Sequence, residues 1–336
     1  MFDKLIIFLP FIITNFLILI YFNKFTKIIN IYDYPDNFRK LHAKKIPLAG
    51  GTIFFVNTII LIILSLTSYA NHFFDNEFFL SSRNYLSFFL LPSLFYFTGL
   101  YDDKYILNSK TKLILTSVFI IFILQIDTDL KILEISLDLT HKVIPLNNFS
   151  LMFTAFCILL FINAFNMLDG VNLNAATYGT ILCIIFLFNG ILNFIVIVYI
   201  LSLLCFLFLN YKNKTFLGDS GSLFIACLLS LIFIKSYNLN LLSTEKIFIL
   251  MIIPGLDLLR LFLERLITGR HPFSPDRNHL HHFINKKLSF HNAAITLQII
   301  FFSPYLFSYL FNDYNVIVVT IGIYFFFSLY VLKKRI

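Results

Sequence analysis

The sequence predicts an all-α polytopic membrane protein: one domain over residues 1–336, folded as a bundle of about 11 (10–11) transmembrane helices. Apolar residues make up 59% of the chain, the mean hydropathy is +0.84, and charged residues make up only 13%. A soluble domain carries about twice that charged share. The composition therefore excludes a disordered chain, a collagen-like fibre and a typical cytosolic enzyme.

Eleven apolar runs justify the predicted helices, since a spanning helix takes roughly 20 residues. The first run follows Lys4 and lacks a small-residue cleavage site, so it is interpreted as an uncleaved span. Four cysteines inside these runs are interpreted as packing residues: Cys157, Cys183, Cys205 and Cys227. The runs lie near 4–22, 48–68, 85–101, 112–126, 149–166, 174–189, 191–210, 217–235, 244–263, 292–311 and 315–332.

The distribution of Lys and Arg predicts the orientation. With the N-terminus outside and the C-terminus in the cytoplasm, the inner segments hold 20 of the 26 basic residues. Every chemically suggestive motif falls on this inner side. The outer segment 127–148 has an alternating pattern that predicts a short strand or an interfacial element. The net charge of +8 is attributed to cytoplasmic loops that face anionic lipid and phosphorylated ligands, not to nucleic acid.

The first motif is GLYDDKYILNSKTK, in which Asp102 and Asp103 follow the third apolar run. Two adjacent carboxylates repel each other, and the C-terminal end of a helix disfavours anions. A divalent cation or a cationic ligand would resolve both problems. The alternative is a solvated turn, with Asn108 or Ser109 capping the next helix.

The second motif is NAFNMLDG, where Asn163, Asn166 and Asp169 form a slanted polar stripe on one helix. Two amides and a carboxylate at a membrane boundary suit sugar hydroxyls, phosphate or metal-bound water. Hydrogen bonding between helices is the alternative.

The third motif is FLGDSGS, in which Asp219 lies between two glycines at the start of a helix. Backbone N–H groups at a helix start can hold phosphate, and small residues let a ligand approach. The alternative is a helix cap made by Asp219 or Ser220.

Basic residues gather in two further segments. GRHPFSPDRNHLHH contains arginines that suit phosphate or pyrophosphate, and histidines at helical spacing. The segment 34–51 places a basic cluster before the second run, where it marks topology or contacts lipid headgroups. The candidate binding residues from the two segments are Arg39, His42, Arg270, Asp276, His279, His281 and His282. In the ninth run, Arg260 is predicted to pair with Glu264, and Asp257 lies deeper in the membrane.

Together and in this order, the motifs resemble the polyprenyl-phosphate N-acetylhexosamine-1-phosphate transferases of glycosyltransferase family four. The resemblance is to the WecA/TagO type and more distantly to the MraY type, and it runs from Pro35 to His282. It implies a bundle of ten or eleven helices in the bacterial inner (cytoplasmic) membrane. The implied activity transfers a sugar 1-phosphate from a UDP-N-acetylhexosamine to undecaprenyl phosphate at the cytoplasmic face. UMP is released, Mg²⁺ (or Mn²⁺) is needed, and a surface polysaccharide such as an O-antigen is initiated.

The resemblance also implies roles for individual residues. Asp102 and Asp103 match an essential acidic pair, one of which activates the lipid phosphate or acts as nucleophile. Asp219 matches a metal ligand; Asp102 and Asp169 complete the expected metal site. Asn163 and Asn166 are expected to line the site with Asp169. The histidines, with Asp276 and the arginines, match the part that binds nucleotide-sugar phosphates.

One departure from the family pattern leaves alternatives open. The usual NxxNxxDGxDGL reads NAFNMLDGVNLNAA here, so Asn172 replaces an aspartate and Leu173 a glycine. The enzyme alternative is a muramyl-pentapeptide-type translocase, and the alternative from another class is a non-catalytic polyprenyl-phosphate binder. A transporter is disfavoured because the polar motifs gather at one face and not at mid-depth. Direct attack by the lipid phosphate is favoured over a covalent intermediate, and a homodimer is left open.

Overall fold

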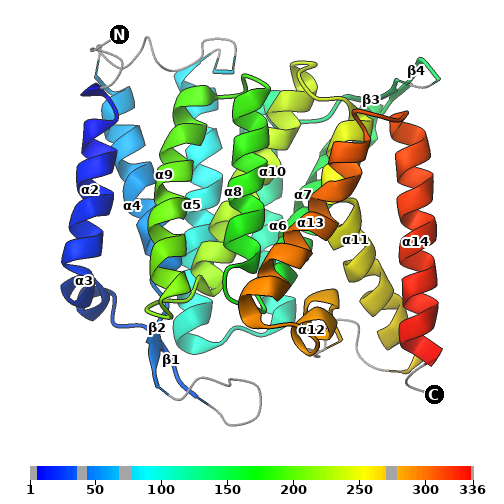
Figure 1. Cartoon of the computed structure of the whole chain (residues 1–336). Helices are drawn as coiled ribbons and strands as arrows, with labels where there is room; N and C mark the ends of the chain where they lie inside the picture. Colours follow the sequence, from blue (N-terminus) through cyan, green and yellow to red (C-terminus); the bar gives the residue numbers. More distant parts are fainter. Residues whose placement is uncertain are drawn as a thin grey trace.

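A computed structural model describes residues 6–35, 44–67, 78–79, 81–138, 140–269 and 278–333. The chain forms upright helices side by side, with a small hairpin at each edge (Figure 1). The helices are α2 (Leu9–Ile20), α3 (Phe22–Ile29), α4 (Gly50–Ser65), α5 (Ser82–Tyr105), α6 (Ser109–Ile126), α7 (Ser150–Leu168), α8 (Asn174–Phe188), α9 (Asn193–Tyr211), α10 (Gly218–Asn238), α11 (Thr244–Ile267), α12 (Leu280–Asn285), α13 (Phe290–Phe307) and α14 (Asp313–Lys333).

Each hairpin is a two-stranded antiparallel sheet. At the lower edge of Figure 1, β1 (Tyr32–Asp33) pairs with β2 (Ile46–Pro47). At the upper edge, β3 (Glu134–Leu137) pairs with β4 (Lys142–Pro145). The second hairpin confirms the strand that the alternating pattern predicted within 127–148.

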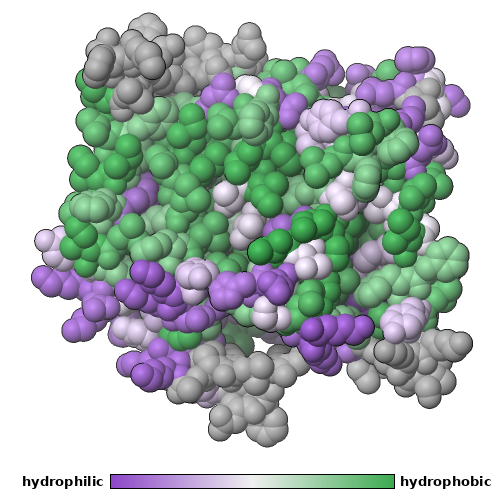
Figure 2. Space-filling view, in the orientation of Figure 1, coloured by the Kyte–Doolittle hydropathy of each residue, from purple (hydrophilic) through white to green (hydrophobic). Residues whose placement is uncertain are grey.

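The helices have the apolar character of a membrane protein. Each of the eleven predicted apolar runs overlaps one of these helices, and most of the helices extend a few residues beyond the run. Within the described residues, five are long and apolar enough to cross a membrane: α6, α7, α9, α10 and α14. A sixth crossing results if α2 and α3, which meet at a bend of 88°, form one span. Figure 2 shows hydrophobic side chains over the middle of the visible face and hydrophilic ones gathered along its lower edge. The fold is a mainly helical membrane bundle, and the count of eleven crossings and the orientation of the termini stay predictions.

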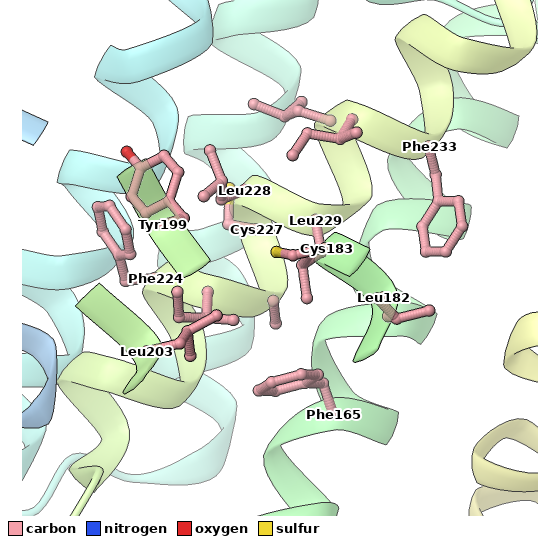
Figure 3. Packing of buried hydrophobic residues seen from close by; sticks show 14 of the residues in the cluster. Phe165, Leu182, Cys183, Tyr199, Leu203, Phe224, Cys227, Leu228, Leu229 and Phe233 are labelled. Carbon is pink, nitrogen blue, oxygen red and sulfur yellow. The ribbon is translucent and has the colours of Figure 1, made fainter. Parts of the chain in front are cut away.

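Helix α10 lies at the centre of the bundle. It packs against α4, α5, α7 and α8, and 94% of its most apolar 18-residue stretch is buried. Figure 3 shows Phe224, Leu228 and Phe233 of α10 among side chains from α7, α8 and α9. The cysteines confirm their predicted role, because all four are free and all but the half-buried Cys157 are buried. The start of α10 is therefore fixed on several sides.

Helix starts follow the chemistry of their capping residues. The side chain of Asn108 accepts a hydrogen bond from the Lys110 N–H at 3.2 Å and begins α6, which confirms the predicted cap. Ser243 caps α11 in the same way, by accepting from the Lys246 N–H at 3.3 Å. The start of α10 has no such local cap.

Candidate active site

Asp103 caps α10 from a different helix. It lies near the C-terminal end of α5, and its two carboxylate oxygens accept hydrogen bonds from the backbone N–H groups of Asp219 (2.8 Å) and Ser220 (3.0 Å). These N–H groups have no partner inside α10, and the positive end of the helix dipole favours an anion beside them. The sequence suggested Asp219 or Ser220 as the cap, but neither hydroxyl nor carboxylate is needed, because Asp103 occupies that position.

Glycines allow this contact between helices. A side chain at Gly99 of α5 would collide with the backbone of Asp219 and Ser220, and one at Gly51 of α4 would lie 2.6 Å from the Ser220 backbone. Gly218 has a φ of +72°, and a Cβ there would lie 2.7 Å from Asp103 Oδ2. Gly51 and Gly99 thus let α4 and α5 approach the backbone at the start of α10, and Gly218 makes room for the Asp103 carboxylate.

Asp102 and Asp219 converge on one lysine. Lys112 Nζ of α6 lies 2.5 Å from Asp102 Oδ2 and 3.1 Å from Asp219 Oδ2. Lys112 is the last residue of the first motif, and no role was predicted for it. Its position ten residues after the acidic pair, at the start of the next helix, is the signal that could have found it.

The asparagine stripe of α7 divides into two parts. Asn166 Nδ2 donates to Asp219 Oδ1 and to Ser222 Oγ, both at 2.7 Å, so it belongs to the site. Asn163 Nδ2 instead donates to the Leu159 carbonyl of its own helix at 2.7 Å. Asp169 is the C-cap of α7 and lies close enough to Asp103 and Asp219 to feel their charge. We call Asp102, Asp103, Asp169 and Asp219 the carboxylate cluster.

Burial and mutual repulsion raise the pKa of two carboxyl groups of the cluster, which lies beyond the apolar run of α5 and at the start of α10. The pKa of Asp103 is raised to about 7 by burial and by the nearby charge of Asp219, against the two N–H donors. The pKa of Asp169 is raised well above its usual value by burial, and Asp219 and Asp103 add to this. Asp103 and Asp169 therefore hold their protons more tightly than ordinary carboxyl groups, and a cation bound beside them would favour their ionised forms.

The cluster has features that suit a cation. Oxygens of Asp102 and Asp219 already face one cationic nitrogen, that of Lys112. Across the described ranges, no three His, Cys, Asp or Glu side chains are yet arranged as a metal-ligand set. A divalent ion held by Asp102 and Asp219 would therefore need Asp169, water or a ligand phosphate to complete its coordination.

The histidine segment (His279–His282) lies against the end of α7. A Cβ at Gly170 would lie 2.6 Å from His281 Nε2, so this glycine makes room for the imidazole. His281 is 2% exposed, and its pKa is lowered to about 3 by burial and by the adjacent histidines. The rings of His279 and His281 stack with centroids 5.2 Å apart. His281 therefore lies against Gly170, the residue directly after Asp169 of the carboxylate cluster.

A buried ionic group holds the segment from the other side. Arg260 pairs with Glu264 at 3.2 Å, as predicted, and with Asp257 at 2.7 Å. Asp257 Oδ2 lies 3.4 Å from His279 Nδ1. Arg39, His42, Arg270 and Asp276 lie outside the described residues.

Asn172 and Leu173, which depart from the family pattern, lie in the loop between α7 and α8. Asn172 Nδ2 donates to Asn213 Oδ1 of the loop before α10 at 2.7 Å. Leu173 has a φ of +69°, a left-handed conformation that costs a residue with a Cβ about 1–2 kcal/mol. The backbone thus retains the shape that suits the glycine expected at this position.

Comparison with known proteins agrees with the motifs. A protein-family model described as "Glycosyl transferase family 4" matches residues 85–237. An undecaprenyl-phosphate alpha-N-acetylglucosaminyl 1-phosphate transferase of Yersinia pestis is 28% identical, over 76% of this chain and 70% of that protein. The protein of that name from Escherichia coli K12 is 26% identical, over 80% and 72%. A probable undecaprenyl-phosphate N-acetylglucosaminyl 1-phosphate transferase of Bacillus subtilis is 27% identical, over 76% and 69%.

Among the described residues, five helices long and apolar enough to cross a membrane indicate a multi-pass membrane protein. The match of the glycosyl transferase family 4 model to residues 85–237, together with these relatives, agrees with the resemblance drawn from the motifs.

Proposed function

We propose that the protein transfers N-acetylglucosamine 1-phosphate, or a closely related N-acetylhexosamine 1-phosphate, from its UDP-sugar to undecaprenyl phosphate, with release of UMP. The observation that carries this proposal is the carboxylate cluster gathered at the start of α10, together with the bridging Lys112. The names of the relatives support the lipid and the sugar. The product would begin a surface glycan, such as an O-antigen.

The site is proposed to face the cytoplasm, in a bundle of eleven crossings with the N-terminus outside. The asymmetry of Lys and Arg supports this orientation. In Figure 1, the first turn of α2 and the last turns of α14 lie at opposite edges, as an odd number of crossings requires. The β1–β2 hairpin and α12 lie at the same edge as the last turns of α14.

The reaction joins two groups that carry like charge. An oxygen of the lipid phosphate attacks the phosphorus that bears the sugar, and the bond from this phosphorus to the bridging oxygen of UMP breaks. Positioning and charge neutralisation are the main demands of such a transfer. A bound Mg²⁺ would supply charge neutralisation, with Asp102 and Asp219 as its proposed ligands and Asp169 beside them.

The roles of the acidic pair separate on structural grounds. Asp103 already accepts two backbone hydrogen bonds, so its role is to hold α5 and α10 together. Asp102 accepts one backbone hydrogen bond, from the Leu107 N–H to Oδ1, and its Oδ2 pairs with the ammonium of Lys112. A lipid phosphate is largely dianionic at neutral pH and hardly needs a strong base. Direct attack, with Asp102 positioning the phosphate or taking its residual proton, therefore remains favoured over a carboxylate nucleophile.

The test is transfer by the purified protein with undecaprenyl phosphate, Mg²⁺ and a panel of UDP-N-acetylhexosamines. Turnover with one sugar is expected, and EDTA should abolish it. Asp219→Asn keeps the size of the side chain but removes its charge, so we expect a loss of at least about a hundredfold in rate. Asp313→Asn is the matched control, since Asp313 pairs with Lys246 at 2.9 Å in another part of the molecule.

Two results would overturn the proposal. Failure of every sugar, with lipid binding intact, would assign the chain to the non-catalytic binders. Turnover that survives both EDTA and Asp219→Asn would remove the carboxylate cluster from the chemistry.

A further inference from the structure

Helix α14 contains a tyrosine, Tyr324, whose polar contacts the position of the helix in the bundle does not require. Only 17% of the most apolar stretch of α14 is buried, so most of the helix faces the surroundings. Tyr324 is among its buried residues, with 8% of its surface exposed. Its hydroxyl donates to Asp257 Oδ1 at 2.6 Å and accepts from Arg260 Nε at 3.4 Å. A phenylalanine would fill the same space, so the hydroxyl is the informative atom.

Asp257 connects α14 to the histidine segment. Its Oδ1 accepts from Tyr324 and from Arg260 Nη2, at 2.6 and 2.7 Å. Its Oδ2 accepts from the backbone N–H of Leu280 at 3.2 Å and lies 3.4 Å from His279 Nδ1. A buried carboxylate with both oxygens engaged has one stable orientation. We call Asp257, Arg260, Tyr324 and His279 the Asp257 network.

Arg260 adds a second connection to the same segment. Its Nη2 donates to the carbonyl of Asn278 at 2.6 Å, directly before the histidines. The backbone on either side of His279 is thus held to α11, by Arg260 at Asn278 and by Asp257 at Leu280. Figure 1 shows α12, which begins at Leu280, at the lower edge of the bundle with the ends of α11 and α14.

The placement of the histidines depends on these bonds because the far side of the segment is tightly packed. His281 lies over Gly170, where there is no space even for a methyl group. A shift of the segment by an ångström would therefore either press the imidazole into α7 or withdraw it from the neighbourhood of Asp169. Misplacement on that scale is enough to impair a site.

We propose that α14 positions the histidine segment, with Tyr324 acting through Asp257 to hold His279–His282 where they bind the pyrophosphate of the nucleotide sugar. This inference rests on the proposed function. Tyr324 is a positioning residue, since its hydroxyl touches Asp257 and Arg260 and not the segment's imidazoles. Its loss should weaken binding of the nucleotide sugar and leave binding of the lipid phosphate unchanged.

The experiment compares Tyr324→Phe with the wild-type protein in steady-state transfer. Removing one hydrogen bond to a buried charged group should raise KM for the UDP-sugar by about tenfold, with kcat and the KM for undecaprenyl phosphate changed less than about twofold. Tyr314→Phe is the control, because Tyr314 lies on the same helix and is 52% exposed. Asp257→Asn, which weakens the bonds on both oxygens, should raise the same KM further.

The outcomes separate this inference from the proposed function. An unchanged KM for the UDP-sugar in Tyr324→Phe overturns the inference, and so does an equal loss for both substrates with a lower Tm, which would assign Tyr324 to packing. If the wild-type protein shows no transfer, the proposed function fails. Calorimetric titration of both proteins with UDP-N-acetylglucosamine then decides, since only weaker binding to Tyr324→Phe supports the inference.

Discussion

The carboxylate cluster and the Asp257 network both contain buried acidic groups, but they balance charge differently. In the cluster, Asp102 and Asp219 share one ammonium, that of Lys112, while the nearby Asp103 accepts from two backbone N–H groups. In the network, donors from a guanidinium, a phenol and a backbone amide occupy both oxygens of one carboxylate. The side chains of Asp219 and Lys112 are 32% and 23% exposed, whereas those of Asp257 and Arg260 are 8% and 5% exposed.

The difference separates a site that awaits a ligand from a part that holds one in place. An accessible excess of negative charge favours an incoming cation. A sealed and fully bonded ion pair gains nothing from a ligand, but it fixes the backbone around it. The two regions should therefore respond differently to the removal of their basic residue.

The largest effect is expected from Arg260→Met, which leaves the carboxylate of Asp257 buried without its main partner. Removing one member of a buried pair costs about 3–5 kcal/mol of stability. We expect a large drop in Tm in detergent solution, and no recovery on addition of Mg²⁺. Recovery by Mg²⁺ would mean that the Asp257 network also binds cations, which would contradict the proposed difference between the network and the carboxylate cluster.

Lys112→Met is the matched change in the cluster. Because Asp219 and Lys112 are partly exposed, we expect a loss of only about 1 kcal/mol in the presence of EDTA. Millimolar Mg²⁺ should restore the Tm of this variant and raise it by more than in the wild-type protein, since a competing ammonium is gone. Equal shifts in the two proteins would show that the ion binds elsewhere.

Gly99→Ala tests whether the cluster depends on the contact between α5 and α10. The new methyl group would collide with the backbone at Asp219 and Ser220. Displacing the start of α10 by about an ångström should lower kcat/KM about a hundredfold. Gly322→Ala is the control, because a Cβ there meets nothing within 4 Å; it should keep full activity.

The smallest effect concerns the loop that leads from α7 to α8. Leu173→Gly removes the cost of a left-handed leucine, although it also frees the unfolded chain. We expect a net gain of up to about 1 kcal/mol in stability, with activity retained. A decrease in Tm would show that the leucine side chain contributes more by packing than its backbone costs.

Much of the fold could be predicted from the sequence, because a helix in a membrane needs a long apolar run and little else. The bend between α2 and α3 was not predictable: it occurs at Tyr21, without a glycine or proline. The acidic motifs could be predicted as one group, since they share the inner side of the membrane. Asn163 could not be distinguished from Asn166, because a carbonyl four residues back is always within reach of an asparagine on a helix.

The residues that escaped prediction act through distant partners. Tyr324 meets Asp257 across 67 residues, and an apolar helix with a tyrosine is ordinary in sequence. Asp103 was recognised as important, but its bond to α10 requires the backbone of α10 to be in place. Local spacing identifies which groups carry charge, and only the fold decides which groups they meet.

The bond between Asp103 and the start of α10 has a consequence for biosynthesis. Its partners are 116 residues apart in the chain, and α6 to α9 are made between them. During translation, Asp103 at the end of α5 lacks these two N–H partners until α10 has been made and inserted. The carboxylate cluster can therefore form only late in assembly. A chain truncated before Gly218 would have every earlier helix but would lack Asp219 and the contact between α5 and α10.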